Sequence, residues 1–387
     1  MSEERHVAVV AGNGLSIAFS KTLLLENITR TLLSELSSIA PDGSPVLKAV
    51  QSVAQRVEHD DKPDESDFEK LVGAFETQAG LILELEQLVD LVPSKSEEIR
   101  EHIKATADFA RRVCDIGTNI VLDCILKNSP TTVDRTSHMH GFFKNLIHTF
   151  DGHITIANLN YDSMIMSCLL QIDAPMCDMA LGWGESKINI TNTKDDDTKE
   201  VVGSYLAKPM RLTSDFPAES KYRLRLLHPH GSVTYWKSRK DGKVVKIPLE
   251  ALRKHNLLGS TKYERPSMSP AVVLANSLEK PRRVKEAPFN LGYEALGKGL
   301  DESEHWLIAG YSFRDHSINE TLRESFQKRK SKPQVLVSTL GWDPPEERIH
   351  NAFGLTSTDG DPAFWLSIDR GGVENLNLSP EWRSFIK

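Results

Sequence analysis

Short apolar runs that end at glycine or polar residues recur along the chain and predict the strands of an α/β fold. The run at residues 6–11 (HVAVVA) is rich in valine and is closed by two glycines, and apolar residues then follow at helical spacing from Ser16. Comparable runs predict strands at 153–157, 223–227, 271–275, 305–309 and 334–337. Strands that alternate with helices favour a Rossmann-like parallel sheet covered on both faces, with ligands at the carboxyl ends of the strands.

Two segments interrupt this alternation. Residues 41–150 have a largely helical pattern and are expected to form a helical insertion, so that residues 1–40 and 151–340 together make the α/β domain. Between Asp178 and Pro270, two strand-like runs flank the turn SRKDG, which predicts a small irregular β module, with residues 194–199 as an exposed loop. Residues 341–387 are expected to be a C-terminal extension containing one helix.

The composition is that of a folded globular protein, with 39% hydrophobic and 26% charged residues in a chain of 387. A formal net charge of -7 gives no general attraction to phosphates, so we expect no direct nucleic-acid binding. The four cysteines form no C-x-x-C pair, which favours a reducing cytoplasmic compartment and no metal. No apolar stretch approaches the ~18 residues of a membrane span, and the acidic N-terminus is unlike a secretory signal, so we expect no membrane association.

Two glycine-containing turns at predicted strand ends are candidate phosphate sites. In residues 12–16 (GNGLS), a diphosphate can approach bare backbone N–H groups at a helix N-terminus. Ile17 stands where a dinucleotide-binding fingerprint needs its third glycine, so a plain tight turn explains this motif equally well. In the second turn, Gly310 permits close backbone approach and the Ser312 hydroxyl is placed to bind a phosphate or a ribose.

Polar residues follow two further predicted strands. In residues 158–162 (NLNYD), the Asn160 amide can orient a water or a sugar hydroxyl and the Asp162 carboxylate can hold a carboxamide, although Asp162 is equally suited to cap the next helix. In residues 228–232 (HPHGS), His228 and His230 compete as a general base, and a purely structural histidine is the plainer interpretation. Asp315 is likewise suited to cap the helix that follows it.

Taken together and in this order, the four motifs resemble those of the sirtuin superfamily, specifically its bacterial branch of antiviral NAD-consuming proteins. Sirtuin-like proteins carry G-A-G-x-S, T-x-N-x-D, a histidine before glycine, and a late G-Y-S-F-x-D-x-x-I-N segment. The matching segments here are Gly12–Ser16, Asn160–Asp162, His230–Gly231 and Gly310–Asn319. Asn13 replaces the alanine of the first motif, and Asn158 replaces the threonine of the second.

The resemblance implies that NAD is the substrate, with His230 as the base, Asn160 orienting water and ribose, and Asp162 holding the nicotinamide carboxamide. It places the rest of the dinucleotide against Gly12, Asn13, Gly14, Ser16, Gly310, Ser312 and Asn319. Deacylating sirtuins generally carry structural zinc on two C-x-x-C pairs, which are missing here, so NAD+ hydrolysis to nicotinamide and ADP-ribose is favoured. The alternatives are an NAD-dependent protein deacylase and a non-catalytic sensor of NAD or ADP-ribose.

The resemblance also implies a role in antiphage defence by NAD+ depletion, an activity that must be restrained in healthy cells. This need motivates the hypothesis that the apolar helices of residues 41–150 mediate homo-oligomerisation or dock a partner such as a translocase-type ATPase. Alternatively, these helices only pack on the α/β core and cover it.

Overall fold

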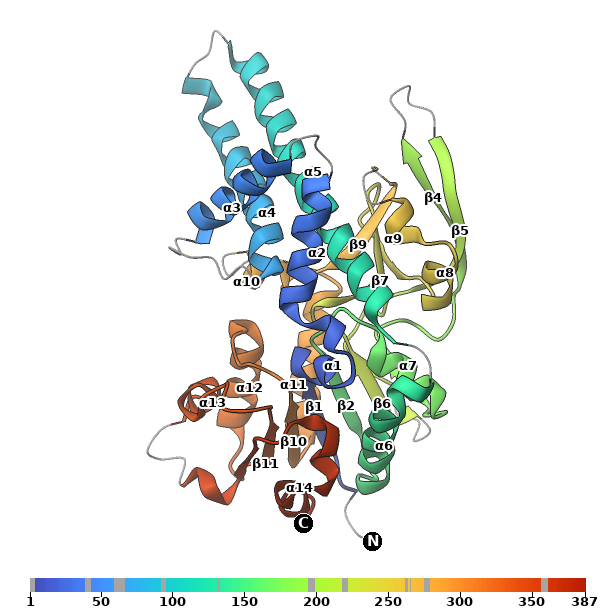
Figure 1. Ribbon diagram of the computed structural model, residues 1–387, viewed down its shortest axis with the longest axis vertical. Helices are drawn as coiled ribbons and strands as arrows, with labels where there is room; N and C mark the ends of the chain where they lie inside the picture. The colour runs from blue at the N-terminus through green and yellow to red at the C-terminus, as the bar shows by residue number, and fades with distance from the viewer. Residues whose placement is uncertain are drawn as a thin grey trace.

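The computed structural model describes residues 4–38, 43–58, 67–91, 95–130, 133–193, 199–217, 222–261, 264, 266–274, 279–355 and 361–387. Its centre is a seven-stranded parallel sheet in the order β12-β11-β10-β1-β2-β6-β3 (Figure 1). The strands are β1 (Val7–Ala11), β2 (Ile154–Asn158), β3 (Met176–Asp178), β6 (Leu224–Leu227), β10 (His305–Ala309), β11 (Gln334–Ser338) and β12 (Leu366–Asp369). The expected Rossmann-like α/β fold is therefore confirmed.

Both faces of this sheet are buried. Along β1, Val7 and Val9 belong to one apolar cluster, whereas Ala8 and Val10 belong to another. The first cluster includes residues of α1 (Asn13–Phe19), α6 (Val133–Thr149), α7 (Met164–Gln171) and α14 (Pro380–Phe385); the second includes residues of α11 (Phe289–Glu302), α12 (His316–Lys328) and α13 (Glu346–Phe353). Because helices cover both faces, ligands are expected at the ends of the strands.

The segment expected to be a small β module forms a five-stranded sheet in the order β4-β5-β8-β7-β9. Its strands are β4 (Ser186–Thr193), β5 (Lys199–Pro209), β7 (Gly231–Ser238), β8 (Val244–Lys246) and β9 (Met268–Val272), and their pairing is antiparallel. The strand expected at 271–275 was wrongly assigned to the parallel sheet: β9 instead pairs with β7, since a short apolar run does not specify its partner. Ala275 and residues 194–198 lie outside the described residues.

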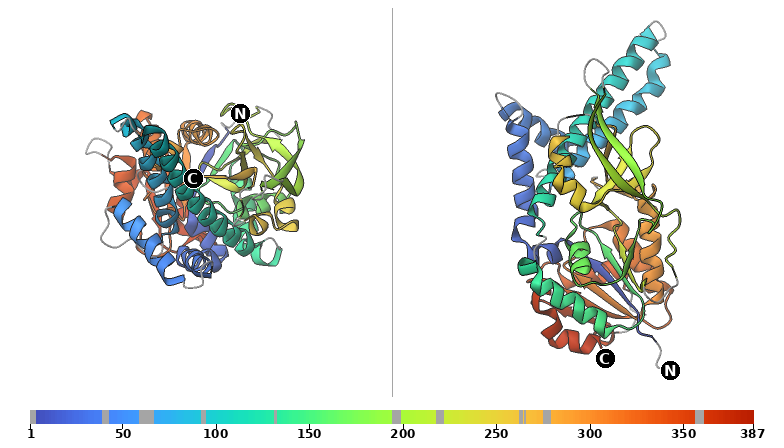
Figure 2. Two further views of the ribbon diagram at one scale, coloured as in Figure 1. Left: turned by 90° about the horizontal axis from the view of Figure 1, so that it is seen from above. Right: turned by 90° about the vertical axis from the view of Figure 1, so that its right-hand side faces the viewer.

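Residues 41–150, expected to be a helical insertion, contain α3 (Gly43–Glu58), α4 (Phe68–Glu84), the 33-residue α5 (Ser96–Asn128) and α6, and α2 (Leu25–Ser38) precedes them. The helix expected from Ser16 is interrupted, because Ser20 is extended and a short 3₁₀ turn, η1 (Lys21–Leu23), separates α1 from α2. Leu71, Val72 and Ile120 are buried in the same apolar cluster as Val7 and Val9 of β1, so part of the insertion covers the core. Figures 1 and 2 show that α4 and α5 also project beyond the sheet as a hairpin.

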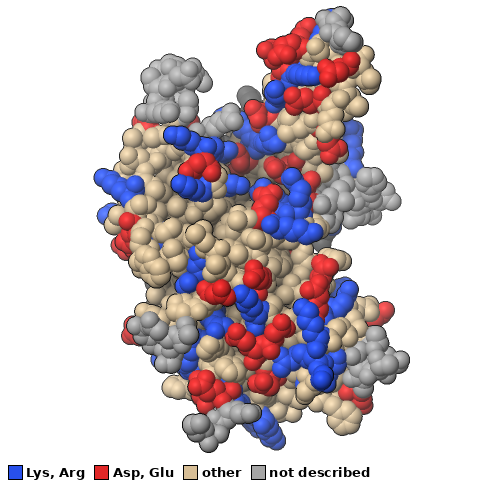
Figure 3. Space-filling view, turned by 180° about the vertical axis from the view of Figure 1, so that it is seen from behind, with Lys and Arg blue, Asp and Glu red and all other residues tan. Residues whose placement is uncertain are grey.

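Residues 341–387, expected to be a C-terminal extension, contribute α13, the edge strand β12 and α14 to the α/β layers. Within the described residues, no helix combines the length and the apolar character needed to cross a membrane. On the face shown in Figure 3, Lys and Arg residues are interspersed with Asp and Glu.

Candidate active site

Two glycine turns meet at the carboxyl ends of β1 and β10. The Gly12 N–H donates to the Ala309 carbonyl, and the Gly14 N–H donates to the Gly310 carbonyl, both at 2.9 Å. A Cβ on Gly12 would lie 2.6 Å from the Gly310 oxygen, and one on Gly14 would lie 2.8 Å from the Gly310 Cα. The glycines therefore let the two turns pack backbone against backbone, and this packing accounts for them without a ligand.

Gly310 is expected to tolerate alanine poorly. Its φ is +64°, and an added Cβ would lie 2.2 Å from the Leu15 nitrogen, so we expect Gly310→Ala to lower the free energy of unfolding by more than ~2 kcal/mol. Gly341→Ala is the matched control, because Gly341 has a φ of +75° but no atom within 4 Å of the added Cβ. Urea unfolding measures both variants, and equal losses would contradict a steric role for Gly310.

Ser16, Asn160 and Asp162 form one hydrogen-bonded cluster beside the first turn. The Asn160 Nδ2 donates to the Gly12 carbonyl at 3.0 Å and to the Ser16 Oγ at 2.7 Å. The Ser16 hydroxyl donates to the Asp162 Oδ2 at 2.7 Å. The Asp162 Oδ1 accepts from the Met164 N–H at 2.9 Å, so the capping interpretation of Asp162 holds alongside its place in the cluster.

The Asp162 carboxyl is buried between Ser16 of α1 and the start of α7. Burial raises its pKa above the ordinary value, while the bonds from the Ser16 hydroxyl and the Met164 N–H oppose this effect. A buried carboxylate that accepts two hydrogen bonds can exchange one of these donors for the N–H of a ligand amide at little cost in free energy, because its oxygens remain hydrogen-bonded.

His230 lies next to this cluster, in the short connection between β6 and β7. Its Nδ1 is 3.1 Å from the Leu159 carbonyl oxygen, which belongs to the residue before Asn160. Its Nε2 is 2.9 Å from the Tyr293 hydroxyl and 3.0 Å from the Asp315 Oδ2. Because a carbonyl only accepts, Nδ1 donates to Leu159, while Nε2 has both a hydroxyl and a carboxylate within hydrogen-bonding distance. The structure thus brings His230, Asn160, Asp162 and Ser16 together.

His228, the competing histidine, has different surroundings. Burial, with the nearby Lys246 ammonium, lowers its pKa to about 4, so the ring is neutral at physiological pH. Its ring packs edge-to-face with Tyr235, and its Nδ1 has no hydrogen-bond partner in the described part of the chain. The Asp178 carboxylate opposes this lowering of the pKa but does not outweigh it, whereas the Nε2 of His230 lies 3.0 Å from the Asp315 Oδ2.

Asp315 links His230 to two residues that the sequence analysis did not single out. As expected, its Oδ1 accepts the Ile318 N–H at 3.1 Å and caps α12. Its Oδ2 also lies 2.8 Å from the Nζ of Lys280, the first residue of α10 (Lys280–Arg283). Lys280 in turn lies 3.4 Å from the Oε2 of Glu69, in the first turn of α4. The helical insertion thus reaches the active site.

The charges of this chain of contacts stabilise one another. Burial alone would raise the pKa of Asp315, but Lys280 and His230 outweigh it and hold that pKa well below its ordinary value. Burial alone would lower the pKa of Lys280, but Glu69 and Asp315 raise it above its ordinary value. The network is completed by the Tyr161 hydroxyl, which donates to the Glu69 Oε1 at 2.6 Å.

Three predicted cofactor-binding residues lie outside the hydrogen-bonded cluster. The Asn319 side chain accepts from the Tyr311 hydroxyl at 2.8 Å and donates to the Phe313 carbonyl at 3.0 Å, which fixes the turn after β10. The Asn13 Nδ2 lies 3.5 Å from the Leu23 carbonyl. Ser312 is half-buried. The dinucleotide-binding roles of Asn13, Ser312 and Asn319 stay predictions.

Residues 154–357 match the family of SIR2-like domains, and this span is just over half of the 387 residues. The chain belongs to the SIR2-like domain family. The SIR2-like match includes Asn160, Asp162, His230 and the turn after β10, whereas the turn after β1 precedes it. Membership supports a function in NAD chemistry, as the sirtuin resemblance implied. A comparison with curated proteins returns no match.

Proposed function

We propose that this SIR2-like protein is an NAD+ glycohydrolase that releases nicotinamide and ADP-ribose. The observation that carries the proposal is the cluster of Ser16, Asn160 and Asp162 beside His230, at the carboxyl ends of β1, β2 and β6. The chemistry of these side chains fits the substrate. Amide and hydroxyl groups suit ribose hydroxyls, and a carboxylate suits the N–H groups of a carboxamide.

In the proposed reaction, Asn160 orients a water and the ribose while Asp162 holds the carboxamide. The water oxygen bonds to C1′, the C1′–N bond breaks through an oxocarbenium-like state, and its electron pair returns to the nicotinamide nitrogen. His230 takes the proton from the water. Holding the reacting groups in place is the main contribution of the site, because the leaving nicotinamide is already a neutral, stable molecule.

His230 must first lose its present partners. Its Nδ1 lies against the Leu159 carbonyl and its Nε2 lies against both the Tyr293 hydroxyl and the Asp315 carboxylate, so no ring nitrogen is free to take a proton from water. We therefore propose that this arrangement is a resting state, in which the contacts of Asp315 with Lys280 and His230 keep the base occupied. Activation then requires that Asp315 or Tyr293 move away from Nε2.

Chromatography of NAD+ incubated with the protein tests this function. Once the contacts at Nε2 of His230 open, the wild-type chain is expected to release nicotinamide and ADP-ribose in equal amounts without any peptide. Its four cysteines form no C-x-x-C pair of the kind that holds zinc in deacylating sirtuins, which supports hydrolysis over deacylation. Transfer of an acyl group from an acylated peptide to ADP-ribose would overturn the hydrolase proposal. Tight binding of NAD+ without nicotinamide release would instead favour a sensor.

We further propose that the protein is an antiphage effector that assembles through the tip of the helical hairpin. Four leucines at the end of α4 and in the adjoining 3₁₀ segment η2 (Leu85–Leu91) are exposed: Leu81, Leu85, Leu88 and Leu91. Exposed apolar clusters of this kind mark interaction surfaces. A second copy of the chain or a translocase-type ATPase is the proposed partner.

Light scattering of the purified protein tests the assembly. We expect a particle larger than a monomer at micromolar concentration, and we expect the double substitution Leu85→Glu and Leu88→Glu to shift it toward monomer, because buried carboxylates oppose an apolar contact. Glu84→Gln, at the neighbouring position, is the control. A monomer with and without NAD+ would count against homo-oligomerisation.

A further inference from the structure

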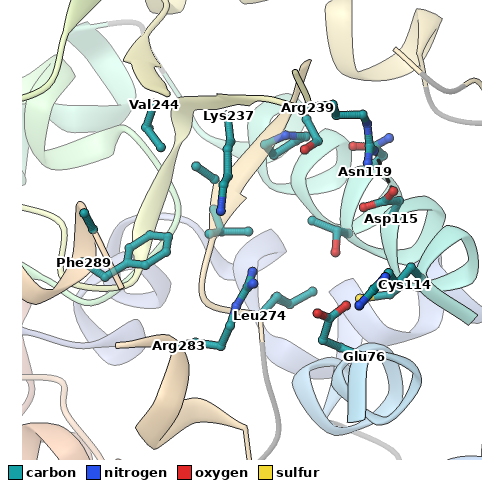
Figure 4. A pocket seen from close by; sticks show the side chains of 17 residues that line it. Glu76, Cys114, Asp115, Asn119, Lys237, Arg239, Val244, Leu274, Arg283 and Phe289 are labelled. Atoms are coloured by element: carbon teal, nitrogen blue, oxygen red, sulfur yellow. Dashed lines mark hydrogen bonds and ion pairs between the residues drawn. The ribbon is translucent and has the colours of Figure 1, made fainter. Parts of the chain in front are cut away.

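A cavity separate from the candidate active site lies between α4, α5, β7, β9 and α10. Its volume is about 210 Å³, and none of the predicted site residues lines it. Figure 4 shows Lys237 and Arg283 extending into it from opposite sides, with Glu76 and Asn119 on a third side. The elements come from the helical insertion, the small sheet and the segment before α11, so the cavity exists only where these three parts meet.

Positive side chains outnumber negative ones on the wall of this cavity, because Arg111, Lys237, Arg239 and Arg283 line it together with Glu76 and Asp115. Lys237 has no ion-pair partner among the described residues. Arg283 pairs with the Glu286 carboxylate at 3.8 Å. Arg239 also lines the cavity, but it is neutralised by Asp115 at 2.6 Å. The Lys237 ammonium and the Arg283 guanidinium repel each other across the cavity. A compact dianion bound between them would attract both.

The α4 and α5 side of the cavity offers acceptors beside the Arg111 guanidinium. The Asn119 side chain is 4% exposed, and its Oδ1 has no hydrogen-bond partner in the described part of the chain. The Glu76 carboxylate also lines this side. A buried acceptor without a partner costs free energy, and hydroxyl groups of a ligand would remove that cost.

We propose that this cavity binds a small sugar phosphate, with the phosphate between Lys237 and Arg283 and the hydroxyls directed at Glu76 and Asn119. The volume supports a ligand of this size, because pockets for drug-sized ligands and cofactors run to about 300–1,000 Å³. A dinucleotide is too large for this space. The proposed ligand site is independent of NAD+ hydrolysis at His230 and stands whether or not that activity is found.

Isothermal titration calorimetry of the full chain with ribose 5-phosphate tests the proposal. We expect saturable binding that weakens as salt is added, and we expect Lys237→Met and Arg283→Met each to weaken it about tenfold or more. Arg282→Met is the matched control on the same helix, because Arg282 is 64% exposed and pairs with Glu279 at 2.8 Å. Its affinity should equal that of the wild-type chain.

The Glu76→Ala variant distinguishes recognition of the sugar hydroxyls from recognition of the phosphate. It should weaken binding of ribose 5-phosphate but not binding of inorganic phosphate, because Glu76 faces only the hydroxyl end. No heat with ribose 5-phosphate at millimolar concentration, or equal losses in Arg282→Met and Arg283→Met, would overturn the proposal. Inorganic phosphate that binds as tightly as ribose 5-phosphate would also overturn it. Should Arg283→Met fail to fold, the affinities of Lys237→Met and Glu76→Ala for ribose 5-phosphate test the proposal in its place.

Discussion

Replacing His230 with alanine is expected to reduce the release of nicotinamide from NAD+ by about 10²–10⁴-fold, the usual contribution of one general base. The alanine has no group that can take a proton from the attacking water. Asn160→Ala should also lose most activity, because the Asn160 amide is joined to Gly12 and Ser16 and would no longer orient the water. Chromatography of the reaction products measures both variants.

Two controls keep this result specific. His148→Ala removes an exposed histidine of α6 and should leave the rate unchanged. Thermal unfolding should show that His230→Ala remains folded, since its loss leaves Asp315 still paired with Lys280 at 2.8 Å. Unchanged turnover in both His230→Ala and Asn160→Ala would remove the proposed catalytic roles, whatever the family membership.

Replacing Lys280 with methionine is expected to lower the free energy of unfolding by about 3–5 kcal/mol at neutral pH, the cost typical of removing one partner from a buried ion pair. The Lys280 and Asp315 side chains are only 15% and 8% exposed, so solvent screens their attraction weakly. Without the ammonium, the Asp315 carboxylate keeps only His230 as a charged partner, and Glu69 loses its cation. Urea unfolding measures the change.

The pH dependence of this loss has a definite sign. In the folded protein the pKa of Asp315 is depressed below the ~3.9 of an unperturbed aspartate, so its stabilising effect is complete above that value. The effect disappears as the pH falls through the depressed pKa. The difference between wild type and Lys280→Met should therefore be largest at neutral pH and shrink below about pH 4.

Lys298→Met is the control for the removal of a lysine. Lys298 pairs with Asp215 at 2.7 Å, but the two side chains are 41% and 73% exposed, so the expected loss is under ~1 kcal/mol. Equal destabilisation of the two variants would contradict the buried ion pair. A difference that grows on acidification would contradict the depressed pKa of Asp315.

The strands of the parallel sheet were predictable because strands buried on both faces have mostly apolar sequences. β1 is a continuous apolar run, and β2 and β10 are mostly apolar; glycine follows β1 and β10 directly, and β2 ends at Asn158. Parallel strands end at the same edge of a sheet, so the meeting of the first turn with Asn160 followed from that arrangement. The partner of β9 was not predictable, because the apolar run at residues 271–275 fits either sheet, and β9 itself begins earlier, at Met268.

The residues that hold His230 were also hidden from sequence reasoning. Lys280 and Glu69 are 211 positions apart, and no local pattern distinguishes either from a solvent-exposed charge. Their contact depends on where the helical insertion lies against the α/β core, which periodicity does not determine. Asp315 was recognised only as a helix cap, because the role of its second oxygen depends on the position of β6 and β7.

The place of Glu69 on α4 gives the helical hairpin a mechanical connection to the proton chemistry of the site. α4 begins beside Lys280, where Glu69 forms an ion pair with it, and the other end of the helix carries the exposed leucines. The two ends of one rigid helix therefore contact the ion-pair network and the solvent. A partner that tilts the outer end would withdraw the Glu69 carboxylate and free Lys280 to move away from Asp315. Assembly at the tip would then be converted into a change in the proton-accepting state of His230.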